Sequence, residues 1–132
     1  MYGSQAAADL KELWRRMVFN ILINNVDDHL NHHGFLHRAY GQWTLAPAFD
    51  LNPFPDKERA LKTWISEESG EAASLAEAIA AAPPFGRANG PAATVLGEVK
   101  SAVRSWKTIA TNTRMSANDI KAFAPAFEHP EL

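Results

Sequence analysis

The chain has 132 residues, of which 46% are hydrophobic and 10% aromatic, so it is long enough for one domain with its own core and too short for two to be expected. Its formal net charge of −2, with no basic excess in either half, does not favour a surface that binds nucleic acid. It has no cysteine, which excludes disulfides and thiolate metal sites, and no apolar run long enough to span a membrane. We expect no secretory signal, and a cytoplasmic location is the default expectation.

The first predicted element is a helix from Gln5 to about Asn24, because apolar residues recur there at three- and four-residue steps. They are Leu10, Leu13, Trp14, Met17, Val18, Ile21 and Leu22. The pattern becomes apolar on all sides over residues 18–23, which indicates that the helix ends in a core. The helix is therefore expected to lead residues 24–33 into an interior cleft.

A change of period over residues 33–46 predicts a small β-hairpin, with a turn at residues 40–42 around Gly41. Pro53 and Pro55 predict an irregular loop over residues 50–56. Residues 61–65 have the composition of a further short strand.

The second half predicts helices. Ser74 is the expected N-cap of a helix through Ala81, with Glu77 completing a capping box. Prolines 83 and 84 end that helix. Pro91 is expected in the first turn of a long helix through Thr111. Its apolar face would hold Val95, Leu96, Val99, Val103, Trp106 and Ile109.

A last helix is predicted over residues 117–127, capped by Ser116 with Asp119 at its third position. The predicted fold class is therefore mainly α, with a small β-hairpin, in one domain over residues 1–132. The four tryptophans are expected to pack in the core or on the hairpin, because basic residues are not interleaved with them as in a stacking platform. They are Trp14, Trp43, Trp64 and Trp106.

Three carboxylates stand out in an otherwise apolar neighbourhood: Asp27, Asp28 and Asp50. Such groups can hold a hard cation or accept a proton. The alternative interpretation is structural, since aspartate also caps helices and turns and accepts hydrogen bonds from backbone donors. Spacing alone does not separate these interpretations.

Histidines beside these carboxylates allow a zinc site as another hypothesis. His29, His32 and His33 lie within five residues, and imidazole with carboxylate is a known zinc shell. The helical HExxH pattern is absent, and hydrogen-bonded loop histidines are the competing interpretation. His37 and His129 are expected to face solvent.

Two segments together resemble the C-terminal part of the HipA family, serine/threonine kinases of bacterial toxin–antitoxin systems. The first contains Phe19-Asn20, Asn25-Val26-Asp27-Asp28-His29-Leu30 and His33-Gly34-Phe35-Leu36. The second is Leu45-Ala46-Pro47-Ala48-Phe49-Asp50-Leu51-Asn52-Pro53. The resemblance continues through Trp106 to Ala126-Phe127-Glu128-His129 and covers nearly the whole chain.

The resemblance implies ATP-dependent phosphorylation of a serine or threonine hydroxyl on a protein substrate. It assigns Asp27 as the base and Asp50 as the ligand of Mg²⁺. By the same resemblance His29 supports the catalytic loop and Asn25 braces it. In the family the kinase is neutralised by a DNA-binding antitoxin, which is the implied partner.

The sequence departs from the family pattern in two ways. Five residues after Asp27 stands His32, where the family has asparagine, and Asn31 comes one position early. Mg²⁺ prefers oxygen ligands, so the His32 imidazole is a poor replacement for the amide oxygen of asparagine. Either Asn31 reaches the metal in its place, or the binding of magnesium and ATP is impaired.

The second departure is the absence of a glycine-rich phosphate loop and of a strand lysine paired with a helix glutamate. The resemblance therefore implies a C-terminal lobe alone, whose further partner is an N-terminal lobe, and little turnover in isolation. The alternative function is a non-catalytic, degenerate kinase lobe that acts as a protein-interaction module.

Overall fold

The computed structural model describes residues 5–25, 34–49, 51–55, 74–87 and 89–132. Five α-helices, one short 3₁₀ helix and two strands make up this part of the chain. In order they are α1 (Ala6–Leu22), β1 (Phe35–Ala39), β2 (Gln42–Leu45), α2 (Leu75–Ala80), the 3₁₀ helix η2 (Pro83–Phe85), α3 (Asn89–Arg104), α4 (Trp106–Asn112) and α5 (Ala117–Phe127). The predicted fold class, mainly α with a small hairpin, is confirmed.

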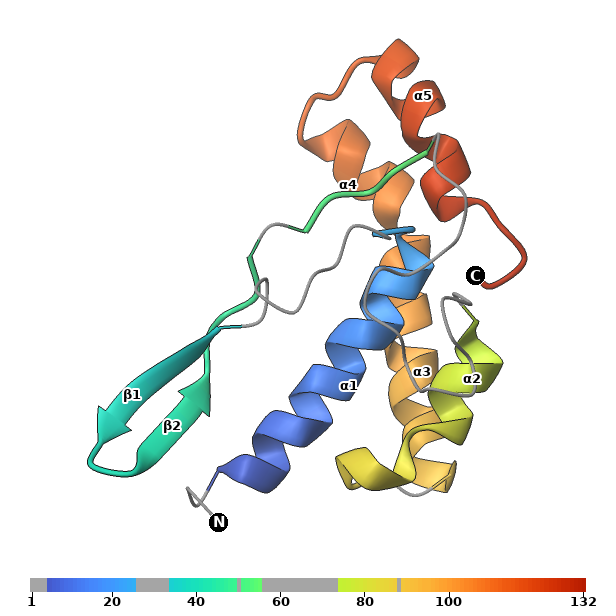
Figure 1. Cartoon of the computed structure of the whole chain (residues 1–132). Helices are drawn as coiled ribbons and strands as arrows, with labels where there is room; N and C mark the ends of the chain where they lie inside the picture. The colour runs from blue at the N-terminus through green and yellow to red at the C-terminus, as the bar shows by residue number, and fades with distance from the viewer. Residues whose placement is uncertain (1–4, 26–33, 50, 56–73, 88) are drawn as a thin grey trace.

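Helix α1 is the central element of the fold. It packs against α2, η2 and α3, whereas α4 packs against the end of α3 and against α5. Figure 1 shows the hairpin projecting to one side of the helices, with α4 and α5 at the end of the molecule to which the C-terminus of α1 points. The C-terminal end of α1 is therefore enclosed, while its N-terminal half supports the hairpin.

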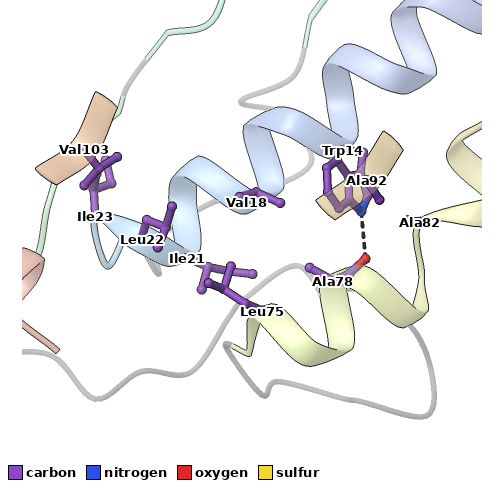
Figure 2. Close-up of a cluster of buried hydrophobic side chains, with 10 residues drawn as sticks. All are labelled: Trp14, Val18, Ile21, Leu22, Ile23, Leu75, Ala78, Ala82, Ala92 and Val103. Carbon is purple, nitrogen blue, oxygen red and sulfur yellow. Dashed lines mark hydrogen bonds between the residues drawn. The ribbon is translucent and has the colours of Figure 1, made fainter. Parts of the chain in front are cut away.

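The core lies where α1 meets α2 and α3 (Figure 2). Its fully buried members from α1 are Trp14, Val18, Ile21 and Leu22. Every residue from 20 to 25 is buried, which confirms the prediction that the apolar end of this helix lies in a core. A helix that is apolar on all sides can end only in such an interior.

Trp14 also closes the C-terminal end of α2. Its indole Nε1–H donates to the Ala78 carbonyl at 2.7 Å, from a ring that is 0% exposed. The Ala82 amide, which would serve that carbonyl in a continuing helix, donates instead to Ile79 at 3.1 Å. The last carbonyls of a helix lack internal partners, so the indole satisfies an acceptor that would otherwise be buried and unmet.

The hairpin follows the predicted pattern. Strands β1 and β2 are antiparallel, and Phe35 pairs with Leu45 at the open end. Gly41 in the turn has a φ of 70°, a conformation that suits glycine. All side chains of β1 and the first two of β2 are exposed, Phe35 by 55% and Trp43 by 51%, and none of the hairpin belongs to the core.

The predicted capping box at the start of α2 is wrong. Ser74 is the N-cap and has extended backbone angles, but its side chain makes no cap hydrogen bond. Instead the Glu131 carboxylate accepts from the Leu75 amide at 3.2 Å. A carboxylate is favoured at the positive end of a helix, and the C-terminal tail supplies it from across the fold.

The long helix predicted from Pro91 to Thr111 is interrupted at Ser105. Its amide donates to Ala102, three residues back, and its hydroxyl donates to the Ser101 carbonyl at 3.5 Å. This side-chain bond competes with the regular helical one, so the chain turns before α4 begins. As a result Ile109, predicted on the buried face, is 57% exposed, and Ala110 is buried in its place.

Other predictions in the second half are confirmed. Pro91 lies in the first turn of α3, and the Ser116 hydroxyl accepts from the Asp119 amide at 3.1 Å to cap α5. Trp106 stacks on Phe127 with ring centroids 4.5 Å apart. The predicted strand at residues 61–65, and Trp64 within it, lie outside the described residues.

His37 faces solvent, as predicted, whereas the same prediction for His129 is wrong. The half-buried His129 ring hydrogen-bonds through Nε2 to the Leu22 carbonyl at 2.7 Å, and its Nδ1 accepts from the Glu131 amide at 3.2 Å. Because Nδ1 is the acceptor, Nε2 carries the hydrogen and donates it to Leu22. The tail therefore folds back to satisfy a carbonyl at the C-terminal end of α1.

Candidate functional site

Most residues predicted to carry chemistry lie outside the described residues. These are Asp27, Asp28, His29, Asn31, His32, His33 and Asp50. Of the predicted site only Asn25 is described. The undescribed site residues fall within residues 26–33 and at residue 50. The structure therefore defines the site by the described residues that precede and follow them along the chain, which include Asn25, Gly34, Phe49 and Phe54.

Asn25 is 1% exposed and belongs to a buried pair of amides. Its Nδ2 donates to Oδ1 of Asn20, also 1% exposed, at 3.0 Å, and its backbone amide donates to the Asn20 carbonyl at 2.8 Å. The resemblance assigns Asn25 to brace the loop that follows, and that role stays a prediction because the loop lies outside the described residues.

Helix α1 ends in a Schellman motif. The Asn25 amide donates to Asn20 in the six-residue bond of this motif, and the Asn24 amide donates to the Ile21 carbonyl at 3.3 Å. Asn24 occupies the left-handed position with a φ of 55°. An apolar contact commonly joins the two ends of such a motif, whereas here Asn20 and Asn25 form a buried hydrogen bond.

Asn24 also joins α1 to the segment that follows the predicted metal ligand. The Phe54 amide donates to the Asn24 carbonyl at 3.3 Å, and Asn24 Nδ2 donates back to the Phe54 carbonyl. We call this pair of hydrogen bonds the first bridge. Along the chain it lies three residues before Asp27 and four residues after Asp50.

A second bridge joins the same two segments at their other ends. The Ala46 amide donates to the Gly34 carbonyl at 2.7 Å, directly beyond the end of the hairpin. A Cβ at Gly34 would stand 3.6 Å from the ring of Phe49, the residue before Asp50, so this ring lies close to the Gly34 backbone. The two bridges thus join both ends of the segments that carry Asp27 and Asp50.

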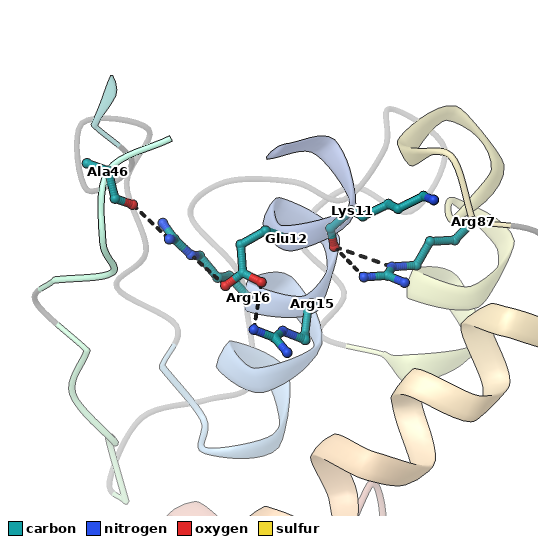
Figure 3. A network of polar contacts seen from close by, with 6 residues as sticks. All are labelled: Lys11, Glu12, Arg15, Arg16, Ala46 and Arg87. Carbon is teal, nitrogen blue, oxygen red and sulfur yellow. Dashed lines mark hydrogen bonds and ion pairs between the residues drawn. The ribbon is translucent and has the colours of Figure 1, made fainter. Parts of the chain in front are cut away.

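Helix α1 holds the hairpin exit that leads to Asp50 (Figure 3). Arg16 Nη2 donates to the Ala46 carbonyl at 2.7 Å, and its Nε pairs with Glu12 at 3.3 Å. Two turns before Arg16, Asp9 Oδ2 accepts from the Leu45 amide at 3.0 Å. These contacts fix the second segment to the helix that leads into the first.

An apolar cavity of about 790 Å³ lies beside the first bridge. Phe54 and its neighbours Asn52 and Pro53 form part of the wall, together with the end of α1. The rest is lined by Ala102, Val103, Trp106, Ile109, Ala110, Thr113, Met115, Phe123 and Phe127. Its lining holds no charged side chain, so the described cavity is not suited to a nucleotide's phosphates.

The described part of the chain contains no cluster of three or more His, Asp or Glu that could hold a metal ion. The predicted magnesium and zinc ligands fall outside this part, so both metal hypotheses stay predictions. Among the helices in the described ranges, none combines the length and the apolar character needed to cross a bilayer.

Sequence reasoning assigned no role to two residues of the site: Asn20, which was named only for the family resemblance, and Asn24. Their signal was present, because an asparagine within the apolar run of residues 18–25 must find a hydrogen-bond partner once that run is buried. His129 had no comparable signal, since its contact depends on how the tail folds back.

Of the comparisons with known proteins, only the one with family models finds a match. No curated protein and no solved structure matches the chain. The family model described as "HipA-like C-terminal domain" matches residues 1–107, which includes both bridged segments. That range is well over half of the chain, and the protein therefore belongs to the family of HipA-like C-terminal domains.

Proposed function

We propose that this chain is the C-terminal lobe of a HipA-like serine/threonine protein kinase, the toxin of a toxin–antitoxin pair. The observation that carries the proposal is the pair of bridges that joins the Asp27 segment to the Asp50 segment. A kinase needs its base and its metal-binding aspartate on two segments held at a fixed separation.

In the proposed reaction the Asp27 carboxylate accepts the proton of a serine or threonine hydroxyl on the substrate protein. The hydroxyl oxygen attacks the γ-phosphorus of ATP, the bond from that phosphorus to the bridging oxygen breaks, and ADP leaves. Asp50 would hold Mg²⁺, which would neutralise charge on the phosphates when bound. His29 and Asn25 support the loop that carries the base.

The donor set fits magnesium in part. The Asp50 carboxylate and the Asn31 amide oxygen are hard oxygen donors of the kind that Mg²⁺ takes, whereas the His32 imidazole is not. We propose that Asn31 is the second ligand. Another lobe is proposed to supply the glycine-rich loop and the lysine that hold the nucleotide's phosphates, and a DNA-binding antitoxin is the proposed regulatory partner.

Calorimetric titration of the purified protein with ATP, with and without magnesium, tests the site. Binding is expected with millimolar affinity and should require magnesium. Asp50→Asn should abolish it. Asp119→Asn is the matched control, because Asp119 is an exposed aspartate in the first turn of α5 and should leave binding unchanged. Binding that needs no magnesium and is unchanged in Asp50→Asn would contradict the assignment of Asp50 as a metal ligand.

His32 favours a second candidate function, a kinase-derived module that binds a partner protein without catalysis. In this case the parent protein should not bind nucleotide at millimolar concentration, and His32→Asn should restore magnesium-dependent binding. Restoration would indicate a site that has lost its metal position. Binding by the parent with an affinity that His32→Asn does not change would contradict this candidate.

A further inference from the structure

We infer that Asn24 is a positioning residue that holds the Asp27 segment and the Asp50 segment at a fixed separation through the first bridge. The inference rests on the proposed function for its catalytic meaning. Its structural content, that one amide side chain couples two segments thirty residues apart along the chain, stands on the described contacts alone.

The backbone at this position does not by itself call for asparagine. Asn24 is the left-handed residue of the Schellman motif that ends α1, and glycine is the residue most favoured there. Asparagine tolerates the conformation at some cost. Its advantage over glycine is the side-chain amide, which donates to the Phe54 carbonyl.

Both sides of the bridge are attached to the core. Asn24 is 3% exposed and directly follows the buried residues Leu22 and Ile23, while the Phe54 side chain packs against the same core cluster. A hydrogen bond between two anchored segments fixes the distance between them, because neither segment can shift without breaking the bond. Loss of the amide should therefore loosen the two segments together.

The chain contains a matched control for the backbone effect. Arg114 ends α4 in the same motif, with a φ of 62° and with the Met115 amide donating to the Ala110 carbonyl at 3.0 Å. Its own amide donates to Thr111, also at 3.0 Å. Because its side chain is exposed, Arg114→Gly changes the backbone preference without removing a bridge.

The experiment compares Asn24→Gly, Asn24→Asp and Arg114→Gly by thermal melting and by amide hydrogen exchange. Arg114→Gly should raise the melting temperature by about 2–4 °C because glycine relieves left-handed strain. The melting temperature of Asn24→Gly should rise by less than this or not at all. Exchange over residues 51–55 and 23–25 should accelerate about tenfold, the factor that one neutral hydrogen bond is worth, and α5 should not change.

Asn24→Asp keeps the shape of the side chain but replaces the donor with a carboxylate facing the Phe54 carbonyl. It should accelerate exchange in the same two segments at least as much as glycine does. The inference would be overturned if exchange accelerated in only one of the two segments. It would also be overturned if Asn24→Gly raised the melting temperature as much as Arg114→Gly does and left exchange unchanged.

Nucleotide titration separates this inference from the proposed function. If the parent protein binds magnesium and ATP, Asn24→Gly should weaken binding about tenfold and Arg114→Gly should not. Unchanged affinity in Asn24→Gly would overturn the positioning assignment. If the parent does not bind, the proposed function fails, and the exchange result alone decides whether Asn24 couples the segments.

Discussion

Replacing Trp14 with phenylalanine should strongly destabilise the fold, because the indole both fills the core and closes the end of α2. The Ala78 carbonyl would lose the donor that now lies at 2.7 Å, at a site where the ring is 0% exposed. An unmet buried carbonyl costs about 1–3 kcal/mol. The smaller ring adds a cavity of roughly 40 Å³, or about 1 kcal/mol at the usual coefficient.

The two costs together give a loss of about 2–4 kcal/mol in the free energy of unfolding. For a domain of this length, 1 kcal/mol corresponds to about 3–4 °C, so the melting temperature should fall by roughly 6–16 °C. Trp43→Phe is the matched control, because Trp43 is 51% exposed on the hairpin and its truncation should cost less than about 0.5 kcal/mol.

Circular dichroism melts and urea titrations of the two variants measure the difference. Equal losses in both variants would show that the bond from Trp14 to Ala78 does not close α2 as described. A large loss in Trp14→Phe that Trp14→Leu does not exceed would point to the hydrogen bond, and not to ring volume, as the main cause.

Substitutions test three further contacts, two of them with a matched control. Arg16→Met keeps the apolar stem but removes the donor to the Ala46 carbonyl, so it should cost about 1–2 kcal/mol and accelerate exchange at the hairpin exit. Arg15→Met, which breaks only an exposed pair with Glu12, should cost under about 0.5 kcal/mol, and a larger loss there would contradict the assignment. His129→Ala should cost about 1–2 kcal/mol in chemical denaturation by freeing the tail from Leu22, whereas His37→Ala should be nearly neutral. Asn25→Ala should lower the melting temperature by about 4–8 °C by removing the buried bond to Asn20, and an unchanged melt would show that this pair is not structural.

Several local features of the fold were predictable because neighbours along the chain supply the cause. The three- and four-residue spacing of α1, the glycine turn of the hairpin and the Ser116 cap of α5 all depend on residues within a few positions of one another. The apolar run over residues 18–23 also predicted a buried helix end, since no solvent-facing side would remain for it.

The candidate site was predictable in a different way. Asp27 and Asp50 were singled out by residue type and by resemblance to the HipA family, and the family is confirmed. Asn25 was assigned a bracing function, which stays a prediction, and the structure shows only that this residue is buried. The bridges that join the two segments were not predicted, because nothing in the spacing of Asn24 and Phe54 indicates that they meet.

The sequence by itself determined the family, most element types in the described part of the chain and their order, because these depend on short-range periodicity, turn residues and local motifs. Only the tertiary structure decided which distant groups satisfy the ends of the helices: Glu131 at α2 in place of Ser74, His129 at the end of α1, and Trp14 at Ala78. The physical reason is that a helix end must find a partner for its exposed donors and acceptors, while the identity of that partner depends on which segment the packed core brings near.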